Sequence, residues 1–116
     1  IKHLFDVFFC NFVPLILITF VENAVKYGSN TITIKTELIK NQFNISVKDD
    51  GIGISKSKHS LLFDKFYRVE QGNLHNAKGL GLGLYYVNQI IKAHQGTIAV
   101  ISDLGKGSEF KIMFKV

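Results

Sequence analysis

Polar side chains interrupt the apolar stretch that follows Pro14 at helical intervals. Proline is compatible with the first turn of a helix, and Gly28-Ser29-Asn30 is typical of a helix end. The pattern predicts a helix from Pro14 to about Tyr27. Four polar residues lie three or four positions apart on one face of it: Thr19, Glu22, Asn23 and Lys26. This polar line is either the solvent face of the helix or part of a ligand site.

Other segments show helical spacing or strand alternation. A helix is predicted from Leu84, with Gly96 at the position of its C-terminal cap. Two hairpins are predicted, one over residues 32–47 with a turn at Lys40-Asn41-Gln42, the other over residues 98–116 with a turn at 103–107. Phe5 to Cys10 also has the character of a strand. Residues 49–76 are rich in loops.

The order of these elements is strand, helix, two strands, long loop, helix, two strands, which predicts an α+β fold. Strands with one polar face bury the other, and helices are the natural cover. We expect a two-layer α/β sandwich, with helices on one face of a mixed, mostly antiparallel sheet and space between the layers for a ligand. The 116 residues contain no repeat or linker, so one domain over residues 1–116 is expected.

Composition narrows the function classes. A net charge of +5 suits a polyphosphate or an acidic partner, but the lysines are scattered and no nucleic-acid-binding motif occurs, so no nucleic-acid partner is expected. Cys10 has no second cysteine to pair with, as is typical of a reducing compartment. The apolar stretch from Phe12 to Val21 is shorter than the roughly 20 residues that span a bilayer. The chain begins without Met inside an apolar run, and we expect a fragment of a longer protein.

The polar line of the first helix has residue types that suit a metal and a phosphate. The amide oxygen of Asn23 can ligate Mg²⁺, which prefers oxygen, and Lys26 can pair with a phosphate. Glu22 can accept a proton from an attacking group. Tyr27 can contact a sugar or base, or it is an ordinary half-buried aromatic residue.

Asp49, Gly51 and Gly53 form the pattern D-x-G-x-G after a predicted strand. An ionised carboxylate accepts hydrogen bonds and so suits the exocyclic amine of adenine, while the glycines would let the base lie against the backbone. The same residues also suit a simple turn. Asp50 has the same chemistry, although the spacing to the glycines favours Asp49.

Gly79, Gly81 and Gly83 alternate with leucines before the second helix. Free N–H groups at a helix N-terminus attract anions, and glycines would let phosphates come close. The spacing is neither the dinucleotide fingerprint nor a Walker A loop. The polar residues 72–78 upstream suggest a mobile flap over a ligand.

Taken together, these segments resemble the catalytic and ATP-binding (HATPase_c) domain of two-component sensor histidine kinases, in the superfamily shared with gyrase, Hsp90 and MutL. Five motifs occur in the family's order: FVENAVKYG (N box), DDGIGI (first glycine box), LFDKFYR (F box), GLGLGLYYVNQIIKAHQG (second glycine box) and GKGSEF (final glycine turn). The stretch around the second glycine box is especially similar to sensor kinases of Bacteroidetes-type bacteria. The resemblance implies the Bergerat ATPase fold.

The resemblance also implies roles for single residues. Asn23 would be the Mg²⁺ ligand, Asp49 the adenine contact and Glu22 the general base. The other implied nucleotide contacts are Lys26, Gly51, Gly53, Arg68, Lys78, Gly79, Gly81 and Gly83, and Tyr27 joins them on chemical grounds. Phe63 and Phe66 would anchor the lid or pack in the core. Two positions depart from the family: Thr19 replaces the first Asn of the N box, and Gln95 replaces a Gly.

The implied activity is transfer of the γ-phosphoryl group of Mg-ATP to a histidine on a separate dimerisation domain, and then to a response regulator. None of the four histidines (His3, His59, His75 and His94) stands in a phosphoacceptor motif. The parent would be a homodimeric membrane sensor with this domain in the cytoplasm. Two alternatives stay open: a degenerate kinase that binds nucleotide as a regulatory module, and an ATPase of the gyrase and Hsp90 kind, whose base would fall on Thr19.

Overall fold

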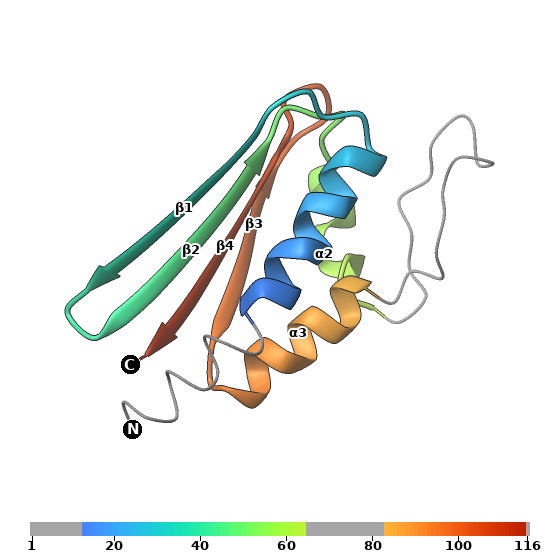
Figure 1. Cartoon of the computed structure of the whole chain (residues 1–116). Coiled ribbons are helices and arrows are strands. Elements are labelled where there is room, and N and C mark those ends of the chain that lie inside the picture. Colours follow the sequence, from blue (N-terminus) through green and yellow to red (C-terminus); the bar gives the residue numbers. More distant parts are fainter. Residues whose placement is uncertain (1–12, 65–82, 116) are drawn as a thin grey trace.

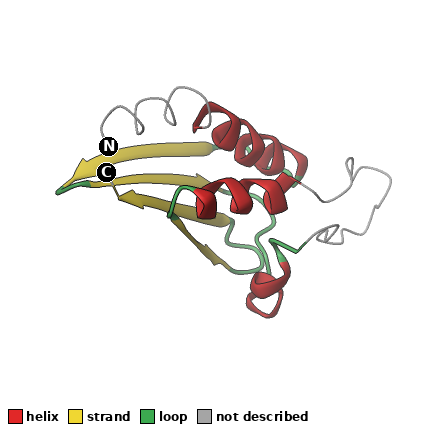
Figure 2. Cartoon of the chain, turned by 90° about the horizontal axis from the view of Figure 1, so that it is seen from below, coloured by secondary structure: helices red, strands yellow, loops and turns green. Residues whose placement is uncertain are grey.

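Two helices pack on one face of a four-stranded sheet in the computed structural model, which describes residues 13–64 and 83–115. The elements in chain order are α2 (Val13–Lys26), β1 (Ile32–Ile39), β2 (Gln42–Asp49), the 3-10 helix η1 (Lys56–Leu61), α3 (Gly83–Ala93), β3 (Thr97–Ser102) and β4 (Ser108–Lys115). Figure 1 shows both α-helices on the same side of the sheet, and Figure 2 shows the two layers from below. The predicted α+β sandwich is confirmed. The strand predicted at Phe5–Cys10 lies outside the described residues.

The four strands pair antiparallel in the order β1-β2-β4-β3. Lys40 and Asn41 both have positive φ, 46° and 65°, and join β1 to β2 as a two-residue turn whose twist suits a hairpin. Gln42, predicted as a turn residue, is the first residue of β2. Asp49 pairs with Ser108, and Ser102 also pairs with Ser108. The end of β2 and the β3–β4 turn therefore meet at one end of the sheet.

The core fills the described interface between the helices and the sheet. Alternate residues of β2 and β4 are buried on the helix side, and α2 contributes Ile16 and Phe20, which are almost fully buried. The rings of Phe20 and Phe110 lie 4.7 Å apart. Apolar side chains of both layers pack against one another in this described part. The expected ligand space between the layers stays a prediction.

The segment that follows the first glycine motif contains an element that was not predicted. The 3-10 helix η1 is short and mostly polar, so it has no hydrophobic period to announce it. Leu62, directly after η1, is buried, and the ring of Phe63 meets the ring of Phe110 edge-on at 6.4 Å. Phe63 therefore packs on the core, the second of its two predicted roles; Phe66 lies outside the described residues.

Helix α2 ends at a glycine, as predicted. Gly28 has φ 85° and donates its N–H to Val25 O at 3.2 Å, and Ser29 N–H reaches back to Ala24 O at 3.1 Å. These two bonds satisfy carbonyl groups of the last turn. The left-handed position, which Gly28 occupies, favours glycine.

Helix α3 ends in the same way, but not at the predicted residue. The left-handed position is Gln95, with φ 59°, and the bonds run from Gln95 N–H to Lys92 O and from Gly96 N–H to Ile91 O. Gly96 is a glycine for another reason: a Cβ there would lie 2.6 Å from the ring of Phe114. Gly96 thus takes part in the predicted C-terminal cap through its N–H, while Gln95 holds the left-handed position.

Candidate functional site

The C-terminal end of α2 is fastened to the loop that follows Asp49. Tyr27 O accepts the N–H of Ile52 at 3.4 Å. A Cβ on Gly51 would lie 3.0 Å from Tyr27 O and 2.9 Å from Ser29 Oγ, so a side chain here would force these neighbours to shift. Asn23 lies one helical turn before this junction, since its carbonyl accepts the N–H of Tyr27 at 3.1 Å. The fold thus brings the Asn23 end of α2 and the Asp49 loop to the same margin of the layers (Figure 1).

The two neighbouring aspartates have different surroundings. Asp50 is exposed, and its Oδ1 accepts the N–H groups of Asn30 at 2.8 Å and Thr31 at 3.0 Å. The bond from Thr31, followed by that from Asn30, holds the pKa of Asp50 below its ordinary value. Asp50 therefore secures the connection between α2 and β1, a role the sequence did not reveal.

Asp49 is half-buried, and the recorded bond of its side chain lies within its own loop. Its Oδ1 accepts the N–H of Gly51 at 2.9 Å. Within residues 13–64 and 83–115, no donor is recorded for its second carboxylate oxygen. Asp49 can therefore accept a further hydrogen bond, and its orientation is already set by the bond to Gly51.

The β3–β4 turn supports the Asp49 loop through glycines. Gly107 has φ 75°, and a Cβ on it would lie 2.1 Å from Asp49 O. Gly53 has φ 74°, and its Cβ would lie 1.9 Å from Asp103 O, while Gly105 N–H donates to Ile52 O at 2.8 Å. Packing between two loops thus explains why Gly53 lacks a side chain. Gly53 is buried and supports the loop, and its expected place near a base stays a prediction.

Two buried serines join the same loops and were missed by the sequence reasoning. The Oγ of Ser102 accepts the N–H of Ile54 at 2.7 Å and donates to Gly107 O at 2.8 Å. The hydroxyl of Ser108, 2.9 Å away, is then the donor of their shared bond, because Ser102 has a single hydrogen to give. In the sequence, the only sign of these bonds is that a small polar residue stands on each side of the predicted turn.

Ser29 is a second residue that the sequence did not single out. Its Oγ is buried and has no hydrogen-bond partner among the residues that the structure describes. It lies on the same side of Gly51 as Asp49 Oδ1, since the two oxygens would be 2.9 and 3.1 Å from a Cβ there. A buried hydroxyl without a partner costs free energy, so it is a notable feature of this junction.

The hydroxyl of Thr19, which stands where the N box has its first Asn, bonds within its own helix. Its Oγ1 donates to Leu15 O, one turn back in α2, at 3.1 Å. Its methyl carbon would be 3.2 Å from a Cβ on Gly83, the first residue of α3. A side chain at Gly83 would therefore be tight against α2, and the expected phosphate contact of Gly83 stays a prediction.

The rest of the polar line lies along the margin of α2. Glu22 is exposed, whereas Asn23, Lys26 and Tyr27 are half-buried. No group of three or more His, Cys, Asp or Glu residues that could hold a metal occurs within the described ranges. Four predicted nucleotide contacts lie outside those ranges, namely Arg68, Lys78, Gly79 and Gly81.

Two histidines lie within the described residues, and neither belongs to α2 or to the Asp49 loop. His94 is exposed at the end of α3, as predicted, with Nδ1 2.8 Å from Ile90 O. His59 belongs to η1, and its Nε2 is 3.3 Å from Ile54 O. His3 and His75 are not among the described residues. None of the helices in the described part of the chain has the length and apolar character to cross a membrane.

Comparison with known proteins identifies similar sequences and folds. Residues 11–116 match the family described as histidine kinase-, DNA gyrase B- and HSP90-like ATPase. The chain is 44% identical over 101 residues to the sensor protein RprX of Bacteroides fragilis, covering 84% of this chain and 20% of that protein. It is 40% identical over 101 residues to the signal transduction histidine-protein kinase ArlS of Staphylococcus aureus, covering 85% and 22%.

Two solved structures have the same arrangement of elements. Full-length ShkA, crystallised in complex with AMPPNP, superposes with a TM-score of 0.73 at 28% identity, over 86% of this chain and 20% of that one. The mycobacterial sensor histidine kinase MprB superposes with a TM-score of 0.76 at 22% identity, over 87% of this chain and 70% of that one. The second likeness concerns the fold alone. The chain spans about a fifth of the length of its two curated relatives.

Proposed function

Because the chain belongs to the histidine kinase-, DNA gyrase B- and HSP90-like ATPase family, we propose that it binds Mg-ATP and donates the γ-phosphoryl group to a histidine. That histidine would lie on a separate dimerisation domain of the same protein. The observation that carries the proposal is the junction of α2 with the Asp49 loop, where Asp50 is engaged by the backbone and Asp49 keeps an oxygen for a ligand. Relatives named as a sensor protein and as a signal transduction histidine-protein kinase support the same activity.

The adenine would bind beside Asp49. The second oxygen of this carboxylate would accept the exocyclic amine, and the bond from Gly51 N–H to its Oδ1 would hold it in place. Gly51 and Tyr27 lie at the same junction, so they are placed to contact the base or sugar. Gly53 would act indirectly, by fixing the loop against the β3–β4 turn.

The phosphates would lie along the polar margin of α2. Lys26 would pair with a phosphate oxygen, and Asn23, one turn before the junction, would give its amide oxygen to Mg²⁺. The residues present fit this ion, because Mg²⁺ retains waters and phosphate oxygens and needs few protein ligands. Bound there, it would neutralise charge on the transferring group. Arg68, Lys78, Gly79, Gly81 and Gly83 complete the proposed set on the lid side.

Glu22 would be the general base. It is exposed beside Asn23 on α2, so an incoming imidazole could reach it. Glu22 would hold the acceptor nitrogen in place and accept its proton. Little else is required of this residue, since phosphoryl transfer depends mainly on position and charge.

The wider setting of the activity extends the proposal. The single domain over residues 1–116 would work within a homodimeric parent, with its own phosphoacceptor domain and the receiver domain of a response regulator as partners. It would be the cytoplasmic part of a membrane-anchored sensor. Support comes from the relatives, which are about five times longer than the matched region.

The test joins this chain to its histidine-bearing domain and measures autophosphorylation with labelled ATP. Glu22→Gln should lower the rate about a hundredfold or more and leave binding of an ATP analogue unchanged. Glu37→Gln, on the exposed strand β1, is the control and should have no effect. A Glu22→Gln protein that phosphorylates at the unchanged rate would remove Glu22 from the chemistry.

Asn23 requires a separate experiment. Asn23→Ala should weaken binding of the ATP analogue in Mg²⁺ and remove most of the difference between binding with and without the ion, because the amide ligand is lost. Isothermal titration of the isolated chain measures both. An unchanged Mg²⁺ dependence would assign the metal contact to another residue.

One alternative is a nucleotide-binding regulatory module without kinase activity, and Thr19 favours it. The Thr19 hydroxyl is bonded to Leu15 O, so the site lacks the second amide of the usual N box. This alternative predicts ATP-analogue binding without phosphorylation even when the histidine domain is attached. A gyrase-like ATPase is disfavoured for another reason. Its base would fall on Thr19, and a threonine hydroxyl cannot act as that base.

A further inference from the structure

Two buried side-chain oxygens in the described part of the chain have no hydrogen-bond partner, Ser29 Oγ and Asn88 Oδ1. Asn88 lies in the middle of α3, whereas Ser29 lies at the junction between the end of α2 and the Asp49 loop. Burying a hydroxyl without a partner lowers stability. Because Ser29 has this cost beside the proposed adenine contact, its hydroxyl is a candidate for a role in ligand binding.

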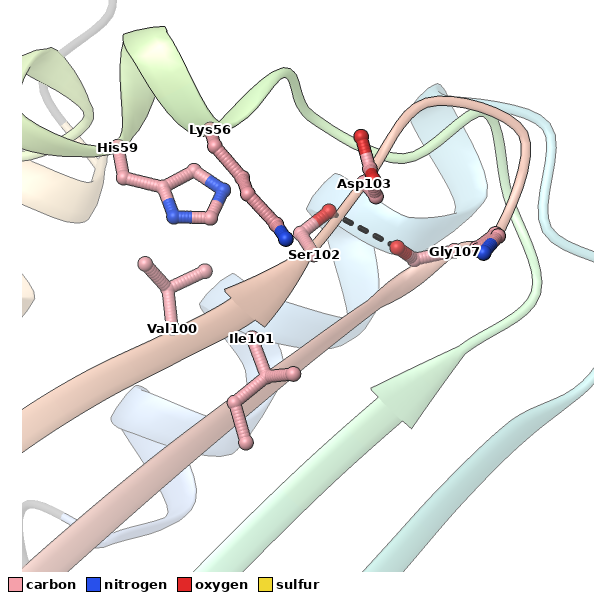
Figure 3. A pocket seen from close by; sticks show the side chains of 8 residues that line it. Lys56, His59, Val100, Ile101, Ser102, Asp103 and Gly107 are labelled. Atoms are coloured by element: carbon pink, nitrogen blue, oxygen red, sulfur yellow. Dashed lines mark hydrogen bonds between the residues drawn. The ribbon is translucent and has the colours of Figure 1, made fainter.

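Other serines of the same loops are buried with their hydroxyls bonded. Figure 3 shows the bond from Ser102 Oγ to Gly107 O, which is 2.8 Å long, at the end of β3. Ser102 Oγ also accepts the N–H of Ile54, and the hydroxyl of Ser108 lies 2.9 Å from it. Both of these serines therefore use their hydroxyls within the protein. Ser29 differs from them, since it keeps a donor that no described residue accepts.

Two acceptors lie beside the Ser29 hydroxyl, on one side of Gly51. Asp49 Oδ1, Tyr27 O and Ser29 Oγ would lie 3.1, 3.0 and 2.9 Å from a Cβ built at Gly51. Tyr27 O is neutral and already accepts the N–H of Ile52. Asp49 is a carboxylate, and hydrogen bonds to charged acceptors are roughly twice as strong as those between neutral groups. Asp49 is therefore the acceptor that the Ser29 hydroxyl should prefer.

The Asp49 carboxylate has room for this second donor. Its Oδ1 accepts the N–H of Gly51 at 2.9 Å, which restrains the position of one oxygen. The terminal torsion of an aspartate side chain has a broad energy minimum, so this bond alone leaves the second oxygen some rotational freedom. Each oxygen of an ionised carboxylate can accept two hydrogen bonds. A second donor to Oδ1, from another direction, would fix the plane of the carboxylate and the direction of its second oxygen.

We propose that Ser29 is a positioning residue for Asp49, a role that rests on the nucleotide site proposed above. When the second oxygen of Asp49 accepts the exocyclic amine of adenine, the Ser29 hydroxyl donates to Oδ1. The hydroxyl then changes from a buried group without a partner to a bonded one, and the free energy gained adds to the affinity for the base. A base with an oxygen in place of the amine offers Asp49 no donor and gains nothing. Ser29 thus strengthens the preference for adenine without touching it.

Binding of a fluorescent ATP analogue to the 116-residue chain tests this role. Ser29→Ala should weaken binding about fivefold to tenfold, because the second donor to Asp49 is lost. Ser29→Thr keeps a hydroxyl and should bind within about threefold of the unaltered chain. Ser60→Ala removes an exposed hydroxyl of η1 and should change Kd less than about twofold. Unchanged binding by Ser29→Ala, or binding by Ser29→Thr that is as weak as that of Ser29→Ala, would contradict the proposal.

Two further readouts separate positioning from a purely structural role. Without nucleotide, Ser29→Ala should leave the urea midpoint of unfolding unchanged or raise it, because the deleted hydroxyl has no partner. The second readout is displacement by an ATP analogue with hydrogen in place of the 6-amino group, for which Ser29→Ala and the unaltered chain should agree within about twofold. A lower urea midpoint, or an equal loss with both analogues, would overturn the positioning role.

Asp49→Asn distinguishes failure of this role from failure of the nucleotide site. In that background Ser29→Ala should have no further effect on binding, and additive losses would show that Ser29 does not act through Asp49. If Asp49→Asn weakens binding and Ser29→Ala does not, the nucleotide site stands and the role of Ser29 is refuted. If the unaltered chain does not bind the analogue, or if Asp49→Asn binds it equally well, the site itself is refuted and the role of Ser29 with it.

Discussion

The C-terminal ends of α2 and α3 have the same hydrogen-bond pattern and different surroundings. At α2 the left-handed residue is Gly28, and Tyr27, directly before it, bonds to the Asp49 loop. At α3 the left-handed residue is Gln95, and Gly96, directly after it, packs against Phe114. One helix end is fixed by loops at the candidate site, and the other by the core.

The difference shows that a glycine can be required for two separate reasons. A Cβ on Gly28 would meet nothing within 4 Å, so only its φ of 85° favours glycine. Gly96 has no positive φ, and the closeness of the Phe114 ring and of Ile91 Cγ2 excludes a side chain. At α3 the two reasons fall on adjacent residues. Steric contact requires glycine at Gly96, while Gln95 occupies the strained left-handed position. Substitutions that separate backbone strain from steric contact test this interpretation.

The largest effect is expected where both reasons coincide, at Gly53. Gly53→Ala places a Cβ 1.9 Å from Asp103 O at a φ of 74°, so the Asp49 loop and the β3–β4 turn must separate. We expect a loss of about 3 kcal/mol or more in the free energy of unfolding, measured in urea.

Gly105→Ala is the control for this substitution. Gly105 has a similar φ, 78°, but a Cβ there would meet nothing within 4 Å. Backbone strain alone should cost about 1 kcal/mol. If the two variants lose the same stability, the loop contact at Gly53 has no energetic importance.

The next effect isolates contact without strain. Gly96→Ala should cost about 2 kcal/mol because the new methyl group overlaps the Phe114 ring. Gly28→Ala, which adds strain without contact, should cost about 1 kcal/mol. Thermal unfolding of both proteins measures the difference. In a double-mutant cycle, Phe114→Leu should remove part of the cost of Gly96→Ala, and strictly additive effects would contradict the assigned contact.

Relief of strain should stabilise the chain by a smaller amount. Gln95→Gly removes a side chain from a left-handed position, with φ 59°, and should raise the free energy of unfolding by about 0.5–1 kcal/mol. Gln89→Gly, within α3 and exposed, should lower it by about 1 kcal/mol. A destabilised Gln95→Gly protein would show that the glutamine side chain has an unrecognised role.

The smallest expected effect concerns Asp50, which is exposed. Its folded pKa lies below the ordinary 3.8 because backbone N–H groups bond to the carboxylate. Its contribution to stability is therefore complete above the unfolded pKa and is lost as pH falls through the folded pKa. Urea unfolding of Asp50→Asn and the unaltered chain should differ at pH 7 and converge in strong acid. Asp64→Asn is the control, and a difference that grows in acid would reverse the assignment.

The elements with regular periods were predictable from the sequence. Alternation over residues 32–47 and 98–116 predicted both hairpins, since one buried face imposes a period of two. The line of polar residues on α2 and the Gly28 turn were predictable because helical spacing and a helix end depend on residues that are close in the sequence. η1 was not, because a short 3-10 helix of polar residues carries no such period.

The parts that could not be predicted depend on residues distant in the chain. Asp50 bonds to residues 30 and 31, and the neighbour that excludes a side chain at Gly53 is Asp103. A Cβ on Gly83 would lie 3.2 Å from the methyl group of Thr19. A glycine pattern shows that something comes close to the backbone, but only the fold shows whether that neighbour is protein.

The most direct test of the proposed site compares the two adjacent aspartates. Binding of a fluorescent ATP analogue to the 116-residue chain is titrated in Mg²⁺ for Asp49→Asn and Asp50→Asn, with the fold of each checked by circular dichroism. We expect Asp49→Asn to weaken binding about tenfold or more and Asp50→Asn to change it less than about twofold, because the Asp50 carboxylate is engaged by Asn30 and Thr31. Equal binding by both variants, or loss confined to Asp50→Asn, would contradict a nucleotide site at Asp49.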